Sequence, residues 1–185
     1  MIILSLMIAL SSALAQTPDE LTHKGHKHTG KYVLGGYASF WSNTAEKTTS
    51  LILEPEFGYL FDDSWGAGTR VVFQKGVDDV KYAWGISPYA RYYYLHKLPF
   101  NFYIDAGFGW NRFTMHSGEV LDGFEAGLRP GACIDLTEGV CLCLHFGFIG
   151  YRKDYLLGEE ENLAETGFGI SFAPEELRIG LELEF

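Results

Sequence analysis

Hydrophobic and polar residues alternate with a period of two along most of the chain from Lys31 onward. Between residues 100 and 111, apolar side chains take every second position, and polar residues, Tyr103 or glycines take the positions between them. Strict alternation over this length is typical of a β-strand with two different faces. The same pattern predicts eight strands, over residues 31–42, 51–61, 65–74, 82–94, 100–111, 124–136, 140–152 and 177–185. No segment has a convincing 3.6-residue period, so the sequence predicts an all-β fold.

The links between these strands alternate between short and long. Short turns hold residues 62–64, 97–99 and 137–139, and longer polar links cover 43–49, 75–81, 114–123 and 154–165 or beyond. Short turns at one end and long loops at the other are typical of transmembrane barrels of the bacterial outer membrane. The expected fold is therefore an eight-stranded antiparallel up-and-down transmembrane β-barrel over residues 31–185, with the short turns facing the periplasm.

The two faces of the strands favour a membrane barrel over a soluble one. Large aromatic residues lie near both ends of the apolar face, as in the aromatic girdles of a lipid-facing band. They are Phe61, Trp65, Tyr92, Tyr94, Phe100 and Phe102 by the short turns, and Trp41, Tyr82, Trp84 and Trp110 toward the long loops. The opposite face predicts a charged network inside the barrel, made of Glu54, Glu56, Arg70, Arg91, Asp105, Glu125, Arg129, Asp135, Arg178, Glu182 and Glu184.

The short turns predict which interior charges meet. Pairing the residues that flank the first short turn places Glu56 opposite Arg70, and pairing across residues 97–99 places Arg91 opposite Asp105. A slip of one residue would set an apolar face against a polar one, so side-chain parity supports both pairs. Because buried charges are costly unless they are paired, these two pairs favour a closed, ion-paired interior.

Three cysteines, Cys133, Cys141 and Cys143, lie in the sixth and seventh predicted strands. Pairing across residues 137–139 places Cys133 directly opposite Cys143 on the interior face, with Cys141 two residues away. Directly opposed residues have α-carbons roughly 4.5–5.5 Å apart, which a disulfide accepts, and the periplasm is oxidising. Cys133 and Cys143 are thus a candidate disulfide. The alternative is that all three remain reduced as small interior side chains.

The N-terminal segment predicts export. Residues 1–15 form an apolar run that ends in Ala13-Leu14-Ala15, the small-x-small pattern of a secretory signal peptide. Residues 16–30 form a polar leader, whose three histidines are better explained as solvated side chains than as metal ligands. The expected organisation is a signal peptide over 1–15, a leader over 16–30 and a barrel over 31–185.

Composition agrees with this interpretation. The 22 glycines and the 16% share of aromatic residues are typical of glycine- and aromatic-rich β structure. The formal net charge of −10 argues against nucleic acid as a partner, because proteins that bind it carry basic patches.

The chain resembles the small eight-stranded outer-membrane barrels of Gram-negative bacteria, of the OmpA/OmpX type and similar to those of Bacteroidetes, without the peptidoglycan-binding domain of full-length OmpA. The residues that carry the resemblance are the signal peptide, the Gly-aromatic stretch 105–110, the segment 55–61 and the terminal strand 177–185. In this family a terminal strand that ends on an aromatic residue is read by the barrel-assembly machinery. The resemblance therefore implies an assembly signal at Leu181, Leu183 and Phe185.

Residues and resemblance together lead us to expect a monomeric, non-enzymatic protein of the cell outer membrane, with a structural or adhesion-like surface-interaction role. Eight strands enclose an interior just wide enough for side chains, so no open pore is expected. The expected partners are outer-membrane lipid, the barrel-assembly machinery and an unidentified surface ligand at the long loops. Neither a cofactor nor a metal is expected.

Two alternatives stay open at this point. One is a secreted, lipocalin-like carrier of a small apolar ligand. The other is a lipid A-modifying outer-membrane hydrolase, some of which use a His and a Ser two residues apart on one face. His116 and Ser117 are adjacent, so they do not match that spacing, and no catalytic residue is predicted.

Overall fold

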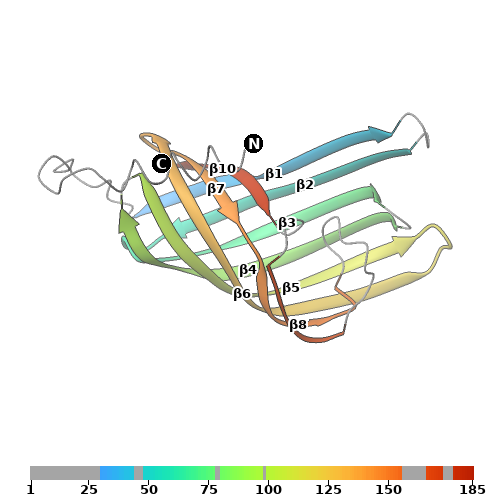
Figure 1. Ribbon diagram of the computed structural model, residues 1–185. Coiled ribbons are helices and arrows are strands. Elements are labelled where there is room, and N and C mark those ends of the chain that lie inside the picture. Colours follow the sequence, from blue (N-terminus) through green and yellow to red (C-terminus); the bar gives the residue numbers. More distant parts are fainter. Residues whose placement is uncertain (1–29, 44–47, 78–79, 98, 156–165, 173–176) are drawn as a thin grey trace, which may run out of the picture.

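The computed structural model describes residues 30–43, 48–77, 80–97, 99–155, 166–172 and 177–185. The predicted signal peptide and all but the last residue of the predicted leader lie outside these residues, as do residues 156–165 and the side chain of Trp41. No helix in the described ranges has the length and apolar character needed to cross a membrane. The strands are β1 Lys31–Asn43, β2 Thr48–Leu60, β3 Trp65–Val77, β4 Val80–Lys97, β5 Phe100–Met115, β6 Val120–Thr137, β7 Val140–His145, β8 Phe148–Lys153, β9 Gly167–Ser171 and β10 Arg178–Glu184 (Figure 1).

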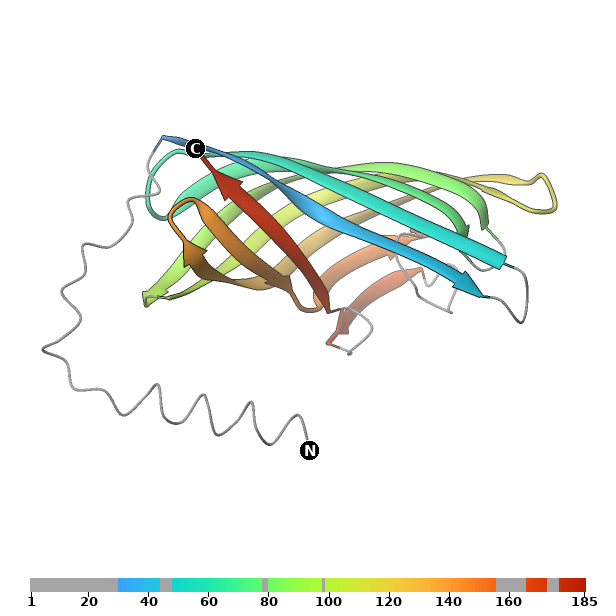
Figure 2. The same cartoon turned by 90° about the horizontal axis from the view of Figure 1, so that it is seen from above.

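These strands form one antiparallel sheet that closes into an eight-stranded barrel. Strands β1 to β7 pair in chain order, and β10 closes the ring by pairing with both β7 and β1 (Figure 2). Tyr32 and Phe185 extend this closing seam, because their backbones exchange hydrogen bonds of 2.8 and 3.1 Å. The predicted all-β, up-and-down barrel is confirmed.

The described residues form ten strand elements, more than the eight predicted strands. The predicted seventh strand is broken between β7 and β8, where Gly147 has a φ of 89° in the left-handed region that favours glycine. Strand β9 pairs with β8. The sequence predicts no strand there, because residues 167–171 lie between the predicted long link, over 154–165 or beyond, and the predicted last strand, which begins at 177. The alternate glycines of β9, Gly167 and Gly169, weaken the strand signal, which explains the missed prediction.

At the long-loop end the strands run further than predicted. Only residues 78–79 separate β3 from β4, and only residues 116–119 separate β5 from β6. The predicted long loops over 75–81 and 114–123 are therefore wrong, because both are tips of extended hairpins. A ladder can continue through polar residues such as Lys75 and Arg112, because their backbone groups pair across the ladder while their side chains are exposed on the outer face.

Two short turns differ from the prediction by one residue. Lys97 pairs with Phe100 in the β4–β5 hairpin, and Thr137 pairs with Val140 in the β6–β7 hairpin. In both hairpins the register then shifts by one residue further along the strands, as in a β-bulge. Each turn is one residue shorter than predicted, and each bulge adds one unpaired residue to its strand. The two differences compensate, so beyond the bulge the residues face the partners that the sequence predicts.

The barrel is apolar outside and charged inside. Phe57, Phe73 and Phe108 are at least half exposed on its outer surface, whereas Arg91 and Asp105 are each 1% exposed. Aromatic contacts on the outer face lie near both ends of the strands. The ring centroids of Trp65 and Tyr92 are 4.7 Å apart near the short turns, and those of Trp84 and Trp110 are 4.9 Å apart toward the other end.

Candidate functional site: the charged barrel interior

Arg91 is the centre of a buried ion cluster. Its Nε donates to Asp105 at 2.8 Å, its Nη1 donates to Glu182 at 3.0 and 3.1 Å, and its Nη2 donates to Glu56 at 2.9 Å. All four side chains are almost fully buried. Opposite charges in direct contact offset the large cost of removing each of them from water. Arg91 and Asp105 also pair across the β4–β5 ladder, where the sequence places them.

Arg70 joins the same three-carboxylate cluster from β3. Its Nε donates to Glu56 at 3.4 Å, and Glu56 and Arg70 face each other across the β2–β3 ladder, where the sequence places them. Its Nη2 donates to Asp105, and the Tyr89 hydroxyl donates to Glu56. Each carboxylate of the cluster thus has at least one guanidinium partner. We call Glu56, Arg70, Arg91, Asp105 and Glu182 the central cluster.

Aromatic rings cover the two guanidinium groups of the central cluster. The Arg91 Cζ atom lies 4.0 Å from the centroid of the Tyr103 ring, and the Arg70 Cζ atom lies 4.3 Å from that of Tyr89. A glycine makes room for each tyrosine, since a Cβ added at Gly131 would lie 2.3 Å from Tyr103, and one added at Gly68 would lie 2.5 Å from Tyr89. Cation–π contacts of this kind gain strength when they are shielded from water.

A second group of charges lies further toward the long-loop end. Glu125 accepts hydrogen bonds from Arg129 and, at 3.1 Å, from Arg152. Both guanidinium groups lie over the Phe148 ring, at 4.9 and 4.2 Å from its centroid. Arg178 donates to Glu54 in a separate pair.

Toward the short turns the interior contains polar groups and sulfur. Lys31 pairs with Glu184 at 3.5 Å, and the Asn101 amide donates to Asp135 at 3.1 and 3.2 Å. Asp135, which the sequence placed in the charged network, thus accepts hydrogen bonds from a neutral amide. These polar contacts lie on the short-turn side of the central cluster.

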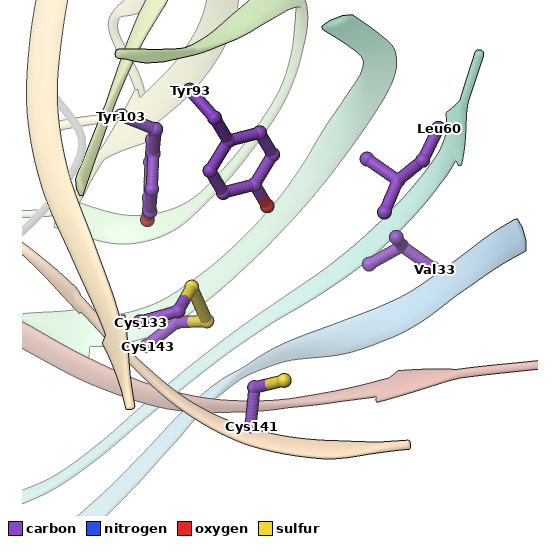
Figure 3. Close-up of a cluster of buried hydrophobic side chains, with 7 residues drawn as sticks. All are labelled: Val33, Leu60, Tyr93, Tyr103, Cys133, Cys141 and Cys143. Atoms are coloured by element: carbon purple, nitrogen blue, oxygen red, sulfur yellow. A yellow bond between two sulfur atoms is a disulfide. The ribbon is translucent and has the colours of Figure 1, made fainter. Parts of the chain in front are cut away.

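Cys133 and Cys143 face each other across the β6–β7 ladder and are joined by a disulfide (Figure 3). Cys141 is a buried free thiol, whose sulfur lies 3.4 Å from Asp135 Oδ1. In Figure 3 the three cysteines share an interior cluster with Tyr93 and Tyr103. Of the two alternatives that the sequence left open, the structure contains the disulfide.

Leu181, Leu183 and Phe185, the predicted assembly signal, all lie on the outer face of the terminal strand, 54%, 45% and 68% exposed. The Phe185 ring lies 6.2 Å from that of Tyr32 on β1. The terminal aromatic residue is therefore part of the seam where the first and last strands meet. Its role as a signal stays a prediction.

Arg152 is an interior residue that sequence reasoning missed. An unbroken strand over 140–152 would place it on the same face as Leu142 and Leu144, outside the barrel. The break at Phe146 and Gly147 shifts the side-chain parity, so that Arg152 points inward to Glu125. The glycine at the break was the available signal, because an isolated glycine within a strand pattern often marks a bulge or a bend.

The interior has little free volume around the central cluster. Three cavities that touch it have volumes of about 20 Å³ each, and a volume of this size admits about one water molecule. Ligand atoms of Glu56, His145 and Glu182 lie within 4.8 Å of one another. Because Arg91 already donates to both carboxylates, this group is better explained as part of an ion cluster than as a metal site.

His116 and Ser117 lie in the exposed turn between β5 and β6. The Ser117 hydroxyl oxygen accepts a hydrogen bond from the backbone of Glu119 at 3.4 Å, so its partner is local.

The interior groups contact one another as ion pairs and hydrogen-bonded neighbours. Their arrangement suits the stabilisation of a filled barrel.

Comparison with known proteins places this architecture among small barrels. No family model matches the sequence, and no curated protein matches it significantly. The structure is similar to the N-terminal β-barrel domain of Pseudomonas aeruginosa OprF, with a TM-score of 0.55 and 14% identity over 85% of this chain and 98% of that one. It is also similar to Neisserial surface protein A, with a TM-score of 0.51 and 16% identity over 86% of this chain and 99% of that one. The chain therefore has the fold of the small eight-stranded outer-membrane barrels.

Proposed function

We propose that this protein is a non-enzymatic β-barrel of the cell outer membrane, with a structural or surface-interaction role. One observation carries the proposal, namely that large apolar side chains face outward while charged side chains are buried inside. A soluble protein places these groups the other way round. Lipid hydrocarbon around the barrel would cover the apolar side chains of the outer face. The closed ladder of backbone hydrogen bonds is what a membrane-spanning strand requires.

The two ends of the barrel differ in a way that supports an orientation. The three short turns and the end of the terminal strand lie at one end. The extended β3–β4 and β5–β6 hairpins and the paired ends of β8 and β9, at Arg152 and Gly167, lie at the other. Outer-membrane barrels have short periplasmic turns and longer extracellular segments. We therefore place the hairpin end at the cell surface, where it would meet any partner.

The filled interior argues against a diffusion pore and against a carrier. The central cluster occupies the lumen between β4 and β10, and the cavities around it admit about one water molecule each. A lipocalin-like carrier needs an apolar interior for its ligand, whereas the side chains buried here include two arginines and three carboxylates in contact. The hydrolase alternative has no support from the positions of His116 and Ser117.

Fractionation and gel mobility test the proposal together. The expressed protein should sediment with the outer membrane and, in detergent, migrate differently on a gel before and after boiling. Planar bilayers that contain the folded protein should show no steady conductance. Recovery in the soluble fraction with unchanged mobility would contradict the membrane assignment, and a stable open channel would contradict the closed interior.

A further inference from the structure

We propose that the outer face of β2, β3 and β4, at the hairpin end, carries a binding site for lipid A, the phosphorylated and multiply acylated lipid of the outer leaflet. The inference rests on the proposed membrane location and orientation. It adds a specific lipid ligand, which neither the fold nor the ion clusters of the interior assign.

The site is a groove of about 210 Å³. Cross-strand pairs build it, since Phe73 faces Trp84 and Lys75 faces Tyr82 across the β3–β4 ladder, and Leu51 faces Lys75 on the other side. Phe73, Tyr82 and Trp84 are 52%, 50% and 40% exposed, so their rings form open walls. Aromatic and aliphatic walls on a lipid-facing surface suit an acyl chain.

Lys75 gives the groove a charged upper end. It is exposed on the same outer face as Phe73, two residues nearer to the tip of the hairpin. None of the residues that the structure describes forms an ion pair with Lys75. An ammonium group above an apolar groove matches a phosphate that sits above acyl chains.

A second cation near the groove already has a partner. Arg112 faces Trp84 across the β4–β5 ladder, and its guanidinium group is paired with Asp122 at 2.8 Å. Among the described residues that line the groove, Lys75 is the cation that can meet a phosphate.

Position and charge together favour lipid A over other lipids. The groove lies at the level of the aromatic girdle, where the polar and apolar layers of the outer leaflet meet. A phospholipid with a zwitterionic head group offers Lys75 a phosphate beside a competing cation. Lipid A instead offers phosphate groups without an internal ammonium, together with several acyl chains for the aromatic walls.

The test uses the full-length mature protein folded in detergent, with a chelator present to remove bridging divalent cations. Native mass spectrometry compares the binding of bis-phosphorylated lipid A with that of its dephosphorylated form. Lys75→Gln should weaken the binding of phosphorylated lipid A about tenfold, the size expected for one charge-assisted hydrogen bond. Lys97→Gln, an exposed lysine near the short turns, is the matched control and should bind like the unmodified protein.

Each outcome decides the question. Selective binding of the phosphorylated lipid that is lost in Lys75→Gln alone supports the site. Equal binding by both variants, equal binding of the dephosphorylated lipid, or no binding by a folded barrel overturns it. Heat-dependent gel mobility of every sample shows whether the barrel is folded, so a failure of the lipid site is distinguishable from a failure of the membrane proposal.

Discussion

Arg91 and Glu182 form an ion pair across the barrel lumen, with Nη1 of Arg91 at 3.0 and 3.1 Å from the two carboxylate oxygens. Their strands, β4 and β10, are separated in the sheet by β3, β2 and β1 on one side and by β5, β6 and β7 on the other. No hairpin register brings these two residues together. The contact forms only because the sheet closes, so it connects the first half of the barrel to its terminal strand.

Replacing Arg91 should destabilise the barrel strongly. Arg91→Met removes one guanidinium that serves three carboxylates and leaves Glu182 buried without this partner. Breaking one side of a buried ion pair costs about 3–5 kcal/mol. Urea unfolding in lipid vesicles, followed by tryptophan fluorescence, would measure the loss. Arg112→Met is the control, because its pair with Asp122 is exposed to solvent and should change the stability little.

Glu56 and Arg70 should show coupled effects on stability. Because the two side chains contact each other inside the barrel, Glu56→Ala should cost much less on an Arg70→Ala background than alone. Four unfolding curves in vesicles complete the double-mutant cycle. A parallel cycle with Arg70→Ala and Lys31→Ala, which belong to separate ion pairs, should be additive. Additivity in the first cycle would contradict the register.

A methyl group at Gly131 should clash with Tyr103. An added Cβ there would lie 2.3 Å from the Tyr103 ring, which is fully buried and cannot withdraw easily. Overpacking of this kind costs about 1–3 kcal/mol, so Gly131→Ala should unfold at a lower urea concentration. Gly169→Ala is the matched control, because nothing lies within 4 Å of its added Cβ. Equal midpoints for the two variants would show that the interior is more loosely packed.

Thiol labelling should find one free cysteine in three. After denaturation without a reductant, a maleimide should add once, at Cys141, and after reduction it should add three times. Mass spectrometry of the intact chain reads both results. Two or three additions without reduction would mean that Cys133 and Cys143 are not bonded in the protein as the cell makes it.

The terminal aromatic residue should matter for assembly. Phe185→Glu places a charge at the seam with Tyr32, and we expect a severalfold lower amount of folded protein in the membrane. Phe61→Glu is the control, since Phe61 is also an exposed aromatic residue at the short-turn end but lies outside the terminal strand. Immunoblots of unheated membrane fractions would compare the two. Equal losses would indicate a general effect of charge on the lipid-facing surface.

The sequence by itself determines the parts of this protein that depend on neighbouring strands. Period-two alternation predicts which residues face outward, and a short turn then sets the partners along a hairpin. Glu56 with Arg70, Arg91 with Asp105 and Cys133 with Cys143 follow from these two rules. The turn prediction can even err by one residue without harm, because in two hairpins a bulge restores the register further along the ladder.

The tertiary structure alone decides the contacts that cross the barrel and the places where the alternation breaks. Arg91 meets Glu182, and Arg70 meets Asp105, because strand number, tilt and closure set the shape of the lumen, which no local pattern encodes. The break at Gly147 turns Arg152 inward against the parity of the strand before it. Alternation is a local property of the backbone, whereas the partner of a buried charge depends on the closure of the whole sheet.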